Sequence, residues 1–338
     1  MMEPYYYSQM DKQQQKIYQI MMSGLVSISQ SFDVPRIDGT EFSDIFYQLR
    51  LDHPEIFYVS TFQYSFYPDS TLVKFKPTYL FGKSKIKEHQ VAMKARVEKL
   101  ARVVKDKNEW EKEQYIHDFI CENVTYDKLK KQYSHEIIGP LGQGVGVCEG
   151  IAKSVKVLCD QLMIPCIVAI SENNPEKNIK YRHAWNVIQI EGIWYHLDAT
   201  FDHSLGKEEP RYDYFNLDDQ NMFKDHEPVI YKLPVCKEGN RFYYKEKKLS
   251  FTKQEEVGKR CQQAIKKGKI LTFHWRGGYF TKAIIEELLK IIADAAKEKN
   301  KYGQVSINWA QAIIRVKFTQ EKVDEAMTLE NAYKEENQ

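Results

Sequence analysis

The sequence lacks several features that point to common function classes. No apolar run approaches the roughly 20 residues that a membrane-spanning helix needs, so no membrane segment is expected. There is no P-loop, no GxGxxG sequence and no DxDxDG-type loop, so nothing suggests a nucleotide cofactor or calcium. The formal net charge of the 338 residues is only +2, which gives no reason to expect a nucleic acid or an anionic membrane as a partner.

Cysteine is sparse, with 6 residues and neither a CxxC pair nor a zinc-finger spacing of Cys and His. Five cysteines stand singly and are expected to be thiols, most of them buried: Cys121, Cys159, Cys166, Cys236 and Cys261. Asp202, His203 and His226 also lack a metal-ligand spacing, so no metal or other cofactor is predicted. The first 20 residues lack the basic start and apolar stretch of a secretory signal, which favours a cytoplasmic location, although a trimmed secreted protein would read the same way.

The composition is that of an ordinary globular protein, with 43% hydrophobic and 28% charged residues. We predict an α+β chain of three parts: an N-terminal region (1–107), a central core (108–235) and a small C-terminal domain (236–338). In the N-terminal region the apolar spacing predicts helices at about 12–30, 42–53 and 85–104 and strands at 55–68 and 71–81. Nothing in the sequence indicates the oligomeric state.

In the central core, the patterns predict a helix at 108–124, a loop at 125–147, a helix from Cys148, a strand at 165–171, a hairpin at 180–201 and irregular structure at 201–235. The C-terminal pattern is hairpin (241–252), lysine-rich helix (to about 267), strand (270–275), helix (279–299) and strands within 305–320.

The stretch GVGVCEG places Cys148 in the first turn of a predicted helix, among three glycines. The positive end of a helix and a nearby imidazolium both stabilise a thiolate, which is the nucleophilic form of cysteine. We expect the glycines at 144, 146 and 150 to keep bulk away from the sulfur, and the amide N–H of Cys148 to be a candidate oxyanion donor. An accidental cysteine at a helix start is the alternative.

A histidine and an aspartate are predicted to meet on the hairpin that follows. If Glu191-Gly192 is a two-residue turn, Ile190 pairs with Ile193 and the opposite strand brings Asp198 diagonal to His183. The carboxylate would then fix the tautomer of the imidazole and favour its charged form. Each of the two residues taken alone is compatible with a structural role, whereas the order Cys, His, Asp with a plausible contact favours a catalytic triad.

Several segments together resemble the transglutaminase-like superfamily, bacterial type. They are Gly146-Val147-Cys148 with Gly150, His183-Ala184-Trp185-Asn186, Trp194-Tyr195, Asp198-Ala199-Thr200, the upstream IHDFICENVTYD and the downstream YFNLDDQNMFKDHEP. The resemblance covers about residues 108–230. Bacterial relatives commonly carry Trp-Asp where Phe201-Asp202 stands here, a mild exchange that we expect to affect only substrate contacts.

The resemblance implies a papain-like core, in which a helix bearing the cysteine packs on an antiparallel sheet. It implies that Cys148 is the nucleophile, His183 the acid/base and Asp198 the residue that orients it. The expected reaction is acyl transfer or hydrolysis at amide bonds of a protein or peptide through a thioester. The alternative is a transglutaminase-like interaction module without activity.

Other residues near these segments are weaker candidates for the site. Gln143 is a candidate oxyanion donor, Tyr126 a candidate for a contact through its hydroxyl, and Trp185 a candidate for shielding His183 or binding substrate; loop or packing roles are the alternatives. His117 is predicted to be structural. His196 is predicted to be structural or, because it shares a face with the aspartate, to support the triad from outside.

Two basic features in the C-terminal region are read as structural. The lysine-rich helix that ends near residue 267 is most simply a solvated helix face. Arg276-Gly277-Gly278 precedes a predicted helix and resembles an anion site, but a plain turn is the favoured interpretation.

Overall fold

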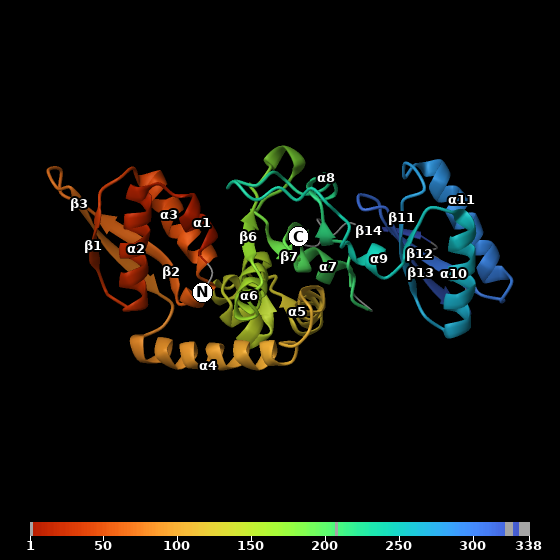
Figure 1. Ribbon diagram of the computed structural model, residues 1–338, viewed down its shortest axis with the longest axis horizontal. Helices are drawn as coiled ribbons and strands as arrows, with labels where there is room; N and C mark the ends of the chain where they lie inside the picture. Colours follow the sequence, from red (N-terminus) through yellow and green to blue (C-terminus); the bar gives the residue numbers. More distant parts are fainter. Residues whose placement is uncertain (1–2, 207–208, 322–326, 331–338) are drawn as a thin grey trace.

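The computed structural model describes residues 3–206, 209–321 and 327–330. The predicted α+β class is confirmed, because helices pack against sheets whose strands are mostly antiparallel. Three bodies lie in a row along the longest axis, from the N-terminal part through the centre to the C-terminal part (Figure 1).

The N-terminal part is a three-stranded antiparallel sheet of order β1-β3-β2 with helices against it. Its elements are α1 (Tyr5–Gln9), α2 (Lys12–Val26), β1 (Phe32–Pro35), α3 (Gly39–Asp52), the 3₁₀ turn η1 (Pro54–Ile56), β2 (Val59–Ser65), β3 (Leu72–Tyr79) and α4 (Lys83–Arg102). Apolar residues of α3 at helical spacing, Phe42 and Phe46, pack on Phe75 of β3. The predicted strands are confirmed over 59–65 and 72–79, where β2 and β3 pair antiparallel, while the start of the first predicted strand forms η1 instead.

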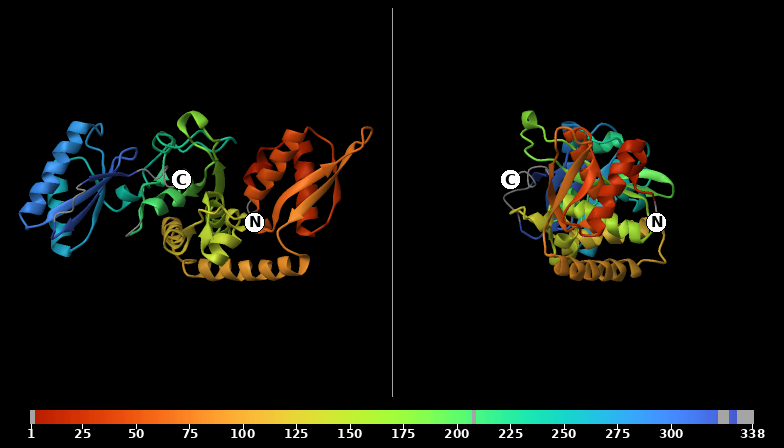
Figure 2. Two further views of the ribbon diagram at one scale, coloured as in Figure 1. Left: turned by 180° about the vertical axis from the view of Figure 1, so that it is seen from behind. Right: turned by 90° about the vertical axis from the view of Figure 1, so that its left-hand side faces the viewer.

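Helix α4 connects the N-terminal part to the centre. Its buried residues Ile86, Met93, Val97 and Leu100 form a stripe at helical spacing. The helix runs below both bodies and extends from one to the other (Figure 2). The apolar stripe joins a single hydrophobic core that includes residues of both the N-terminal and the central parts.

The central part holds a four-stranded antiparallel sheet of order β6-β7-β8-β9. Its elements are α5 (Glu109–Asn123), β4 (Thr125–Tyr126), the 3₁₀ turn η2 (Gln132–His135), the π-helical turn η3 (Ile138–Gln143), β5 (Val145–Gly146), α6 (Cys148–Gln161), β6 (Cys166–Ile170), η4 (Pro175–Lys177), β7 (Ala184–Ile190), β8 (Ile193–Leu197), α7 (Ala199–Leu205), β9 (Phe215–Leu217) and α8 (Asp219–Met222).

Strand β7 contributes side chains to two hydrophobic cores. Ile188 and Ile190 pack into the core that α6 shares with the N-terminal part. Trp185 and Val187 belong to a second core, against which the side chain of Cys148 also packs. The second core therefore reaches both the β7 residues that follow His183 and the start of α6.

The prediction of irregular structure for 201–235 is wrong in part. Helix α7 begins directly after Asp198, and β9 and α8 follow it. The physical reason is a helix cap: the Asp198 carboxylate accepts hydrogen bonds from the backbone N–H groups of Thr200 and Phe201.

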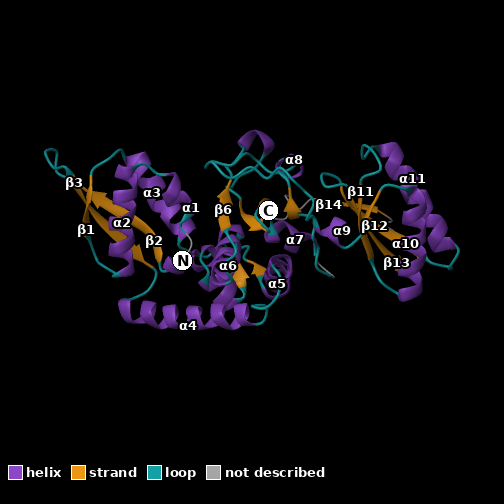
Figure 3. Ribbon diagram, in the orientation of Figure 1, coloured by secondary structure: helices purple, strands orange, loops and turns teal. Residues whose placement is uncertain are grey.

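The C-terminal part is a five-stranded sheet of order β10-β11-β13-β12-β14, with α10 and α11 on one face (Figure 3). Its elements are α9 (Tyr243–Glu246), β10 (Ser250–Phe251), α10 (Gln254–Lys267), β11 (Leu271–Trp275), α11 (Lys282–Lys297), β12 (Tyr302–Asn308), β13 (Ile313–Thr319) and β14 (Met327–Glu330). The helices and strands predicted after residue 253 are confirmed.

The hairpin predicted at 241–252 is wrong, because this segment forms α9 followed by β10. Lys248 adopts a left-handed conformation with φ 55°, which turns the chain between the two elements. Strand β10 then pairs in parallel with β11, with Ser250 opposite His274, rather than with the segment 241–248 that precedes it. Across the described residues, no helix is both long and apolar enough to cross a membrane.

Candidate active site

Cys148 is the first residue of α6, as the sequence predicts. Its side chain is half-buried, and Val147 before it is extended, with φ −100° and ψ 172°. The approach to the helix is held by the backbone: β5 pairs in parallel with β4, and the N–H of Val147 donates to the carbonyl of Ser134 at 3.0 Å. The thiol therefore stands at the positive end of a 14-residue helix.

The glycines around Cys148 serve close packing of the chain. A Cβ on Gly150 would lie 2.1 Å from the carbonyl oxygen of Ser134, and a Cβ on Gly146 would lie 2.6 Å from the ring of Pro140. Gly144 has a φ of 67°, a conformation that favours glycine. Gly146 and Gly150 therefore make room for Pro140 and Ser134, and the expectation that the glycines keep bulk away from the sulfur stays a prediction.

A buried ion network fixes the first turn of α6. Lys153 contacts Glu149 of the same helix at 2.8 Å and Glu136 of the preceding loop at 2.9 Å. Arg50 of α3 also pairs with Glu136, which ties the N-terminal part to this loop. Burial alone would raise the pKa of Glu149, but Lys153, His135 and Arg50 outweigh it and hold that pKa well below its usual range.

The hairpin register is the predicted one. Glu191 and Gly192 both have positive φ, 52° and 82°, which is the geometry of a two-residue type I′ turn. Ile190 pairs with Ile193, and the ladder continues without a shift between β7 and β8 to Asn186 and Leu197. Asp198 directly follows Leu197, the last residue of β8. The carboxylate of Asp198 therefore reaches His183, which directly precedes β7.

His183 and Asp198 make the predicted contact. The His183 Nε2 lies 2.6 Å from Asp198 Oδ2, and both side chains are buried. The imidazole lies between the Trp185 ring at 5.7 Å and the Phe201 ring at 4.7 Å, measured between centroids. Phe201 is thus a packing partner of the imidazole, which corrects the expectation that this position affects only substrate contacts.

Strand β7 is attached to α6 close to these residues. The buried side-chain amide of Asn186 donates to the carbonyl oxygen of Ala152 at 2.9 Å. Asn186 follows His183 by three residues, and Ala152 follows Cys148 by one helical turn. This hydrogen bond holds the start of α6 against the end of the strand where His183 stands.

His226 is a site residue that the sequence analysis missed. Its Nε2 lies 2.9 Å from Asp198 Oδ2, the same oxygen that His183 contacts, and its Nδ1 lies 3.0 Å from Asp225 Oδ1. Because both ring nitrogens face carboxylate oxygens, both carry protons and the ring is a cation. Burial would lower the pKa of His226, but the hydrogen bonds to Asp198 and Asp225 outweigh burial and raise it.

Asp198 therefore accepts four hydrogen bonds, two from imidazoles and two from the start of α7. Burial would raise the pKa of this carboxyl, but His183 and His226 more than offset burial and hold it well below its usual range. The group is an anion throughout the neutral range and does not compete with His183 for a proton.

Trp185, which packs on the His183 ring, is hydrogen-bonded to His196, which in turn contacts Asp219. The indole N–H of Trp185 donates to His196 Nδ1 at 3.0 Å, and His196 Nε2 contacts Asp219 Oδ1 at 2.8 Å. His196 thus supports Trp185, which packs on His183. The side chain of His196 is therefore linked to His183 through the tryptophan and not through Asp198.

Gln143 and Tyr126 lie on the segments next to Cys148. Gln143 is exposed at the end of η3, and no side-chain hydrogen bond joins it to another described residue. Tyr126 is half-buried on β4, where it pairs with Gly146, and packs against the larger core. Their predicted roles toward substrate stay predictions.

His117 is buried in a separate cluster. Its Nε2 lies 3.1 Å from Asp202 Oδ2 and 3.6 Å from the sulfur of Cys121, and its Nδ1 lies 3.2 Å from Asp118. These contacts join α5 to α7, which is the structural role predicted for His117. Burial is the main cause that raises the pKa of Asp202 to about 7 and also raises the pKa of Cys121.

Among the residues that the structure describes, two groups of side chains are close enough to resemble metal sites, with ligand atoms within 4.8 Å: His183, Asp198 and His226, and His196, Asp219 and Cys236. In both groups hydrogen bonds account for the spacing. In the second, the N–H of Trp185 requires His196 Nδ1 to be an acceptor, so His196 Nε2 carries the proton and offers no lone pair to a cation. We therefore assign no metal to either group.

Residues 97–199 match the model of the Transglutaminase-like superfamily. A search of curated proteins found no match. Two similar solved structures are a TGase, 13% identical with a TM-score of 0.30, and a candidate cysteine protease from Cytophaga hutchinsonii, 20% identical with a TM-score of 0.28. The alignments cover 42% and 41% of this chain, respectively. They cover 44% and 61% of the two solved chains, so this chain spans less than two thirds of the length of either. For residues 97–199, the family match supports the resemblance to the transglutaminase-like superfamily that the sequence motifs indicate.

Proposed function

We propose that the chain is a cysteine-dependent enzyme that cleaves or transfers acyl groups at amide bonds of a protein or peptide through a thioester on Cys148. The observation that carries the proposal is the 2.6 Å contact between His183 Nε2 and Asp198 Oδ2. It leaves Nδ1 as the ring nitrogen for proton exchange with the thiol, at a place where Asn186 joins the strand to the cysteine helix.

Acylation follows from these groups. The thiolate of Cys148 attacks the amide carbonyl carbon, a C–S bond forms, and the carbonyl electron pair moves to oxygen, where the helix-start N–H groups are candidate donors. The tetrahedral species collapses, the C–N bond breaks, and the departing nitrogen takes a proton from the His183 imidazolium. Asp198 stays ionised and keeps the imidazole in one orientation.

Deacylation returns the site to its starting state. Water, or a primary amine, attacks the thioester while neutral His183 accepts its proton. The C–S bond breaks, the acid or new amide leaves, and the thiolate–imidazolium pair is restored. Hydrolase and transferase outcomes share all these steps and differ only in which nucleophile reaches the thioester.

The proposal includes an arrangement of parts. Residues 108–235 would form the catalytic core, with 1–107 and 236–338 attached to either side. The attachments reach the site: Arg50 of α3 pairs with Glu136 behind α6, and Gln311 donates to Asp225, the partner of His226. We propose that both flanking regions hold the catalytic residues in place.

The first test is thiol labelling at neutral pH with one equivalent of iodoacetamide, followed by peptide mass spectrometry. Cys148 should be alkylated fastest, and His183→Ala should slow the reaction. Cys121 is the matched comparison, because it is also half-buried and lies 3.6 Å from an imidazole, but burial raises its pKa. Equal labelling of both cysteines, or labelling of neither, would contradict an activated thiol at Cys148.

The second test is trapping of the acyl-enzyme. The protein is incubated with a peptide mixture and a fluorescent primary amine, and intact mass is measured after acid quenching. A thioester adduct is expected on the wild-type chain and on Cys121→Ala, but not on Cys148→Ala. If binding of a protein partner is found, survives Cys148→Ala and no adduct forms, the chain is an interaction module and the enzymatic proposal fails.

A further inference from the structure

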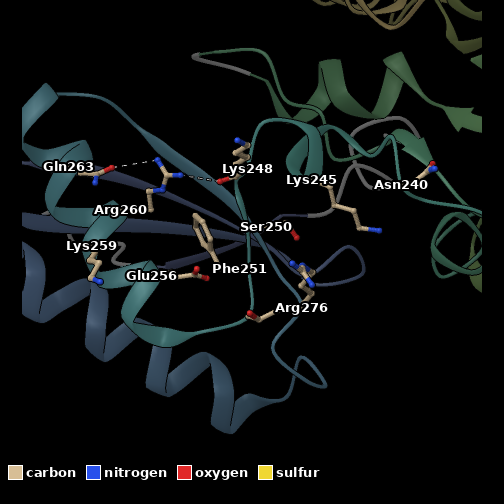
Figure 4. A pocket seen from close by; sticks show the side chains of 11 residues that line it. Asn240, Lys245, Lys248, Ser250, Phe251, Glu256, Lys259, Arg260, Gln263 and Arg276 are labelled. Atoms are coloured by element: carbon tan, nitrogen blue, oxygen red, sulfur yellow. Dashed lines mark hydrogen bonds between the residues drawn. The ribbon is translucent and has the colours of Figure 1, made fainter. Parts of the chain in front are cut away.

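The C-terminal part contains a cleft of about 860 Å³ that lies outside the triad and its supporting residues (Figure 4). It is lined by residues from three segments: the approach to α9 and β10, one face of α10, and the turn after β11. On α10, Glu256, Lys259, Arg260 and Gln263 recur at the spacing of one helix face. A cleft of this volume is in the range typical of small-molecule sites, roughly 300–1,000 Å³.

Positive charge dominates the lining. The cations are Lys245, Lys248, Lys259, Arg260 and Arg276, and the single acid is Glu256, so five positive charges against one negative leave a formal excess of four. Within the described part of the chain, none of the five forms an ion pair. A concave surface lined by one sign of charge concentrates the field and attracts ions of the opposite sign.

Two of the cationic side chains, those of Arg260 and Lys245, donate hydrogen bonds to uncharged groups of the protein. Arg260 donates to the carbonyl of Lys248 at 3.2 Å and to the side chain of Gln263 at 3.5 Å, which uses two of its five N–H groups (Figure 4). Lys245 donates to the carbonyl of Gly239 at 2.6 Å. The charges are therefore partly oriented without being neutralised.

Two nearby groups respond to this charge. The pKa of His274 is lowered to about 3, first by burial and then by Lys245, Lys224 and Arg276. The pKa of Lys245 is lowered by burial and by Arg276, with Asp218 opposing. Cations from separate segments thus act on the same small volume.

The cleft offers no stacking surface. Phe251 is the one aromatic residue among its lining residues, and only 4% of it is exposed, beneath Arg260, whose Cζ lies 5.9 Å from the ring. Nucleobases and single-stranded nucleic acids are bound largely by stacking on exposed aromatic rings. The lining therefore suits an anion without a base.

We infer that this cleft is a binding site for a compact polyanion that carries two or more phosphate groups. Arginine and lysine are the side chains that bind phosphate, the first through its planar fork and the second as a point charge. Arg276 of the Arg276-Gly277-Gly278 turn lines this site, as do Lys259 and Arg260 of α10, although both features were read as structural from the sequence. The inference is independent of the proposed acyl-transfer activity.

The test is calorimetric titration of the full chain with inorganic tripolyphosphate, ATP, inorganic phosphate and a glutamate oligomer at low salt. Tripolyphosphate should bind one to one, inorganic phosphate should bind at least about tenfold more weakly, and ATP should gain nothing from its base. Affinity should fall as ionic strength rises. Tighter binding of ATP than of tripolyphosphate, equally tight binding of a glutamate oligomer, or no binding of tripolyphosphate would each overturn the inference.

The variant pair Lys259→Gln/Arg260→Gln should lose tripolyphosphate affinity by about tenfold or more. The matched control is Lys266→Gln/Lys267→Gln, which removes the same charge from exposed positions of α10 outside the cleft. Equal losses in both pairs would mean that only overall charge matters. A measurement on the unmodified protein guards against misfolded variants: tripolyphosphate should slow acetylation of Lys248 and Lys259 but not of Lys266, and uniform acetylation would refute the site.

Discussion

Replacing Asp198 by asparagine is the sharpest test of the proposed site, because it removes the charge and keeps the shape. Asp198 Oδ1 caps α7, and Oδ2 accepts from His183 and His226. Asparagine has one oxygen, so if it keeps the cap, its NH₂ group faces two imidazole N–H donors. Asp198→Asn should therefore lose both charge-assisted hydrogen bonds, and His183 should turn or change tautomer.

The magnitude follows from those two bonds. Hydrogen bonds to charged groups contribute about 1.5–3 kcal/mol each, so the free energy of unfolding should fall by roughly 3–6 kcal/mol. The rate of acylation should fall by about 10⁴, the size of effect seen when an imidazole is left in the wrong tautomer. The assays are urea unfolding followed by tryptophan fluorescence, and the rate of acyl-enzyme formation by intact mass.

The same variant makes a prediction about pH. The pKa of Asp198 in the folded state is held well below its usual value of about 4. At pH values above about 4, the ionised carboxylate therefore adds its full contribution to the stability of the folded state. The gain is lost as pH falls below about 4 toward the folded-state pKa. Asp198→Asn should therefore lose stability less steeply between pH 4 and 2 than the unaltered chain.

Asp202→Asn is the matched control, since Asp202 is also a buried carboxylate on α7 that contacts an imidazole, that of His117. It should lower stability and leave the reactivity of Cys148 within a few-fold of the unaltered chain. If Asp198→Asn acylates within about tenfold of the unaltered chain, or if Asp202→Asn is the more damaging of the two for acylation, the assignment of Asp198 is refuted.

Three further changes test the surroundings of the site. His226→Gln should leave one donor on Asp198 Oδ2 and slow acylation by about tenfold at unchanged substrate binding, measured as separate kcat and KM; no change in kcat would exclude a positioning role. Asn186→Ala should lower the free energy of unfolding by about 0.5–1.5 kcal/mol in urea, because it removes a buried hydrogen bond that ties β7 to α6; an unchanged midpoint would contradict this. Gly150→Ala places a Cβ 2.1 Å from the Ser134 carbonyl oxygen, so stability should fall by roughly 1–3 kcal/mol and alkylation of Cys148 should slow, whereas a normal alkylation rate would show that the loop is not needed.

The contact between His183 and Asp198 could be predicted because local chemistry determines it. A Glu-Gly pair accommodates the positive φ values of a two-residue turn, and that turn fixes the pairing of β7 with β8. Once the register is known, the period of two along a strand decides which side chains meet. The position of Cys148 was predictable for a similar reason, since the apolar spacing of α6 begins directly after it.

His226 could not be predicted from local patterns, because nothing local connects it to Asp198 28 residues earlier. Its place depends on the chain after α8 returning to β6, where the N–H of Ile230 donates to the carbonyl of Ile170 at 2.9 Å. The downstream DHEP segment was a usable signal, because it lies in the stretch that resembles relatives of the same family. In the sequence analysis His226 was considered only as a metal ligand.

The error at 241–252 has a different cause. Alternating aromatic and polar residues there are typical of strands, but the side chains of Phe242 and Tyr244 are buried in the second core and Tyr244 donates to Asp213 at 2.9 Å. These tertiary contacts favour the short helix α9 over a strand. The cleft described above depends on that turn, since Lys245 is on α9 and Lys248 directly follows it.

The charge state of His226 bears on how the proposed reaction would run. With its two nitrogens on two carboxylates, the His226 cation is balanced by Asp225, which also accepts from the Tyr214 hydroxyl at 2.7 Å. Asp198 is then left with its full negative charge for His183. Transfer of a proton from Cys148 to His183 leaves the summed charge of the site unchanged. The only individual charges that change are those of the thiol and of the His183 imidazole. A cationic His226 therefore lets Asp198 be fully buried and remain an anion in both states of the thiol, which is what an orienting carboxylate in a water-poor site requires.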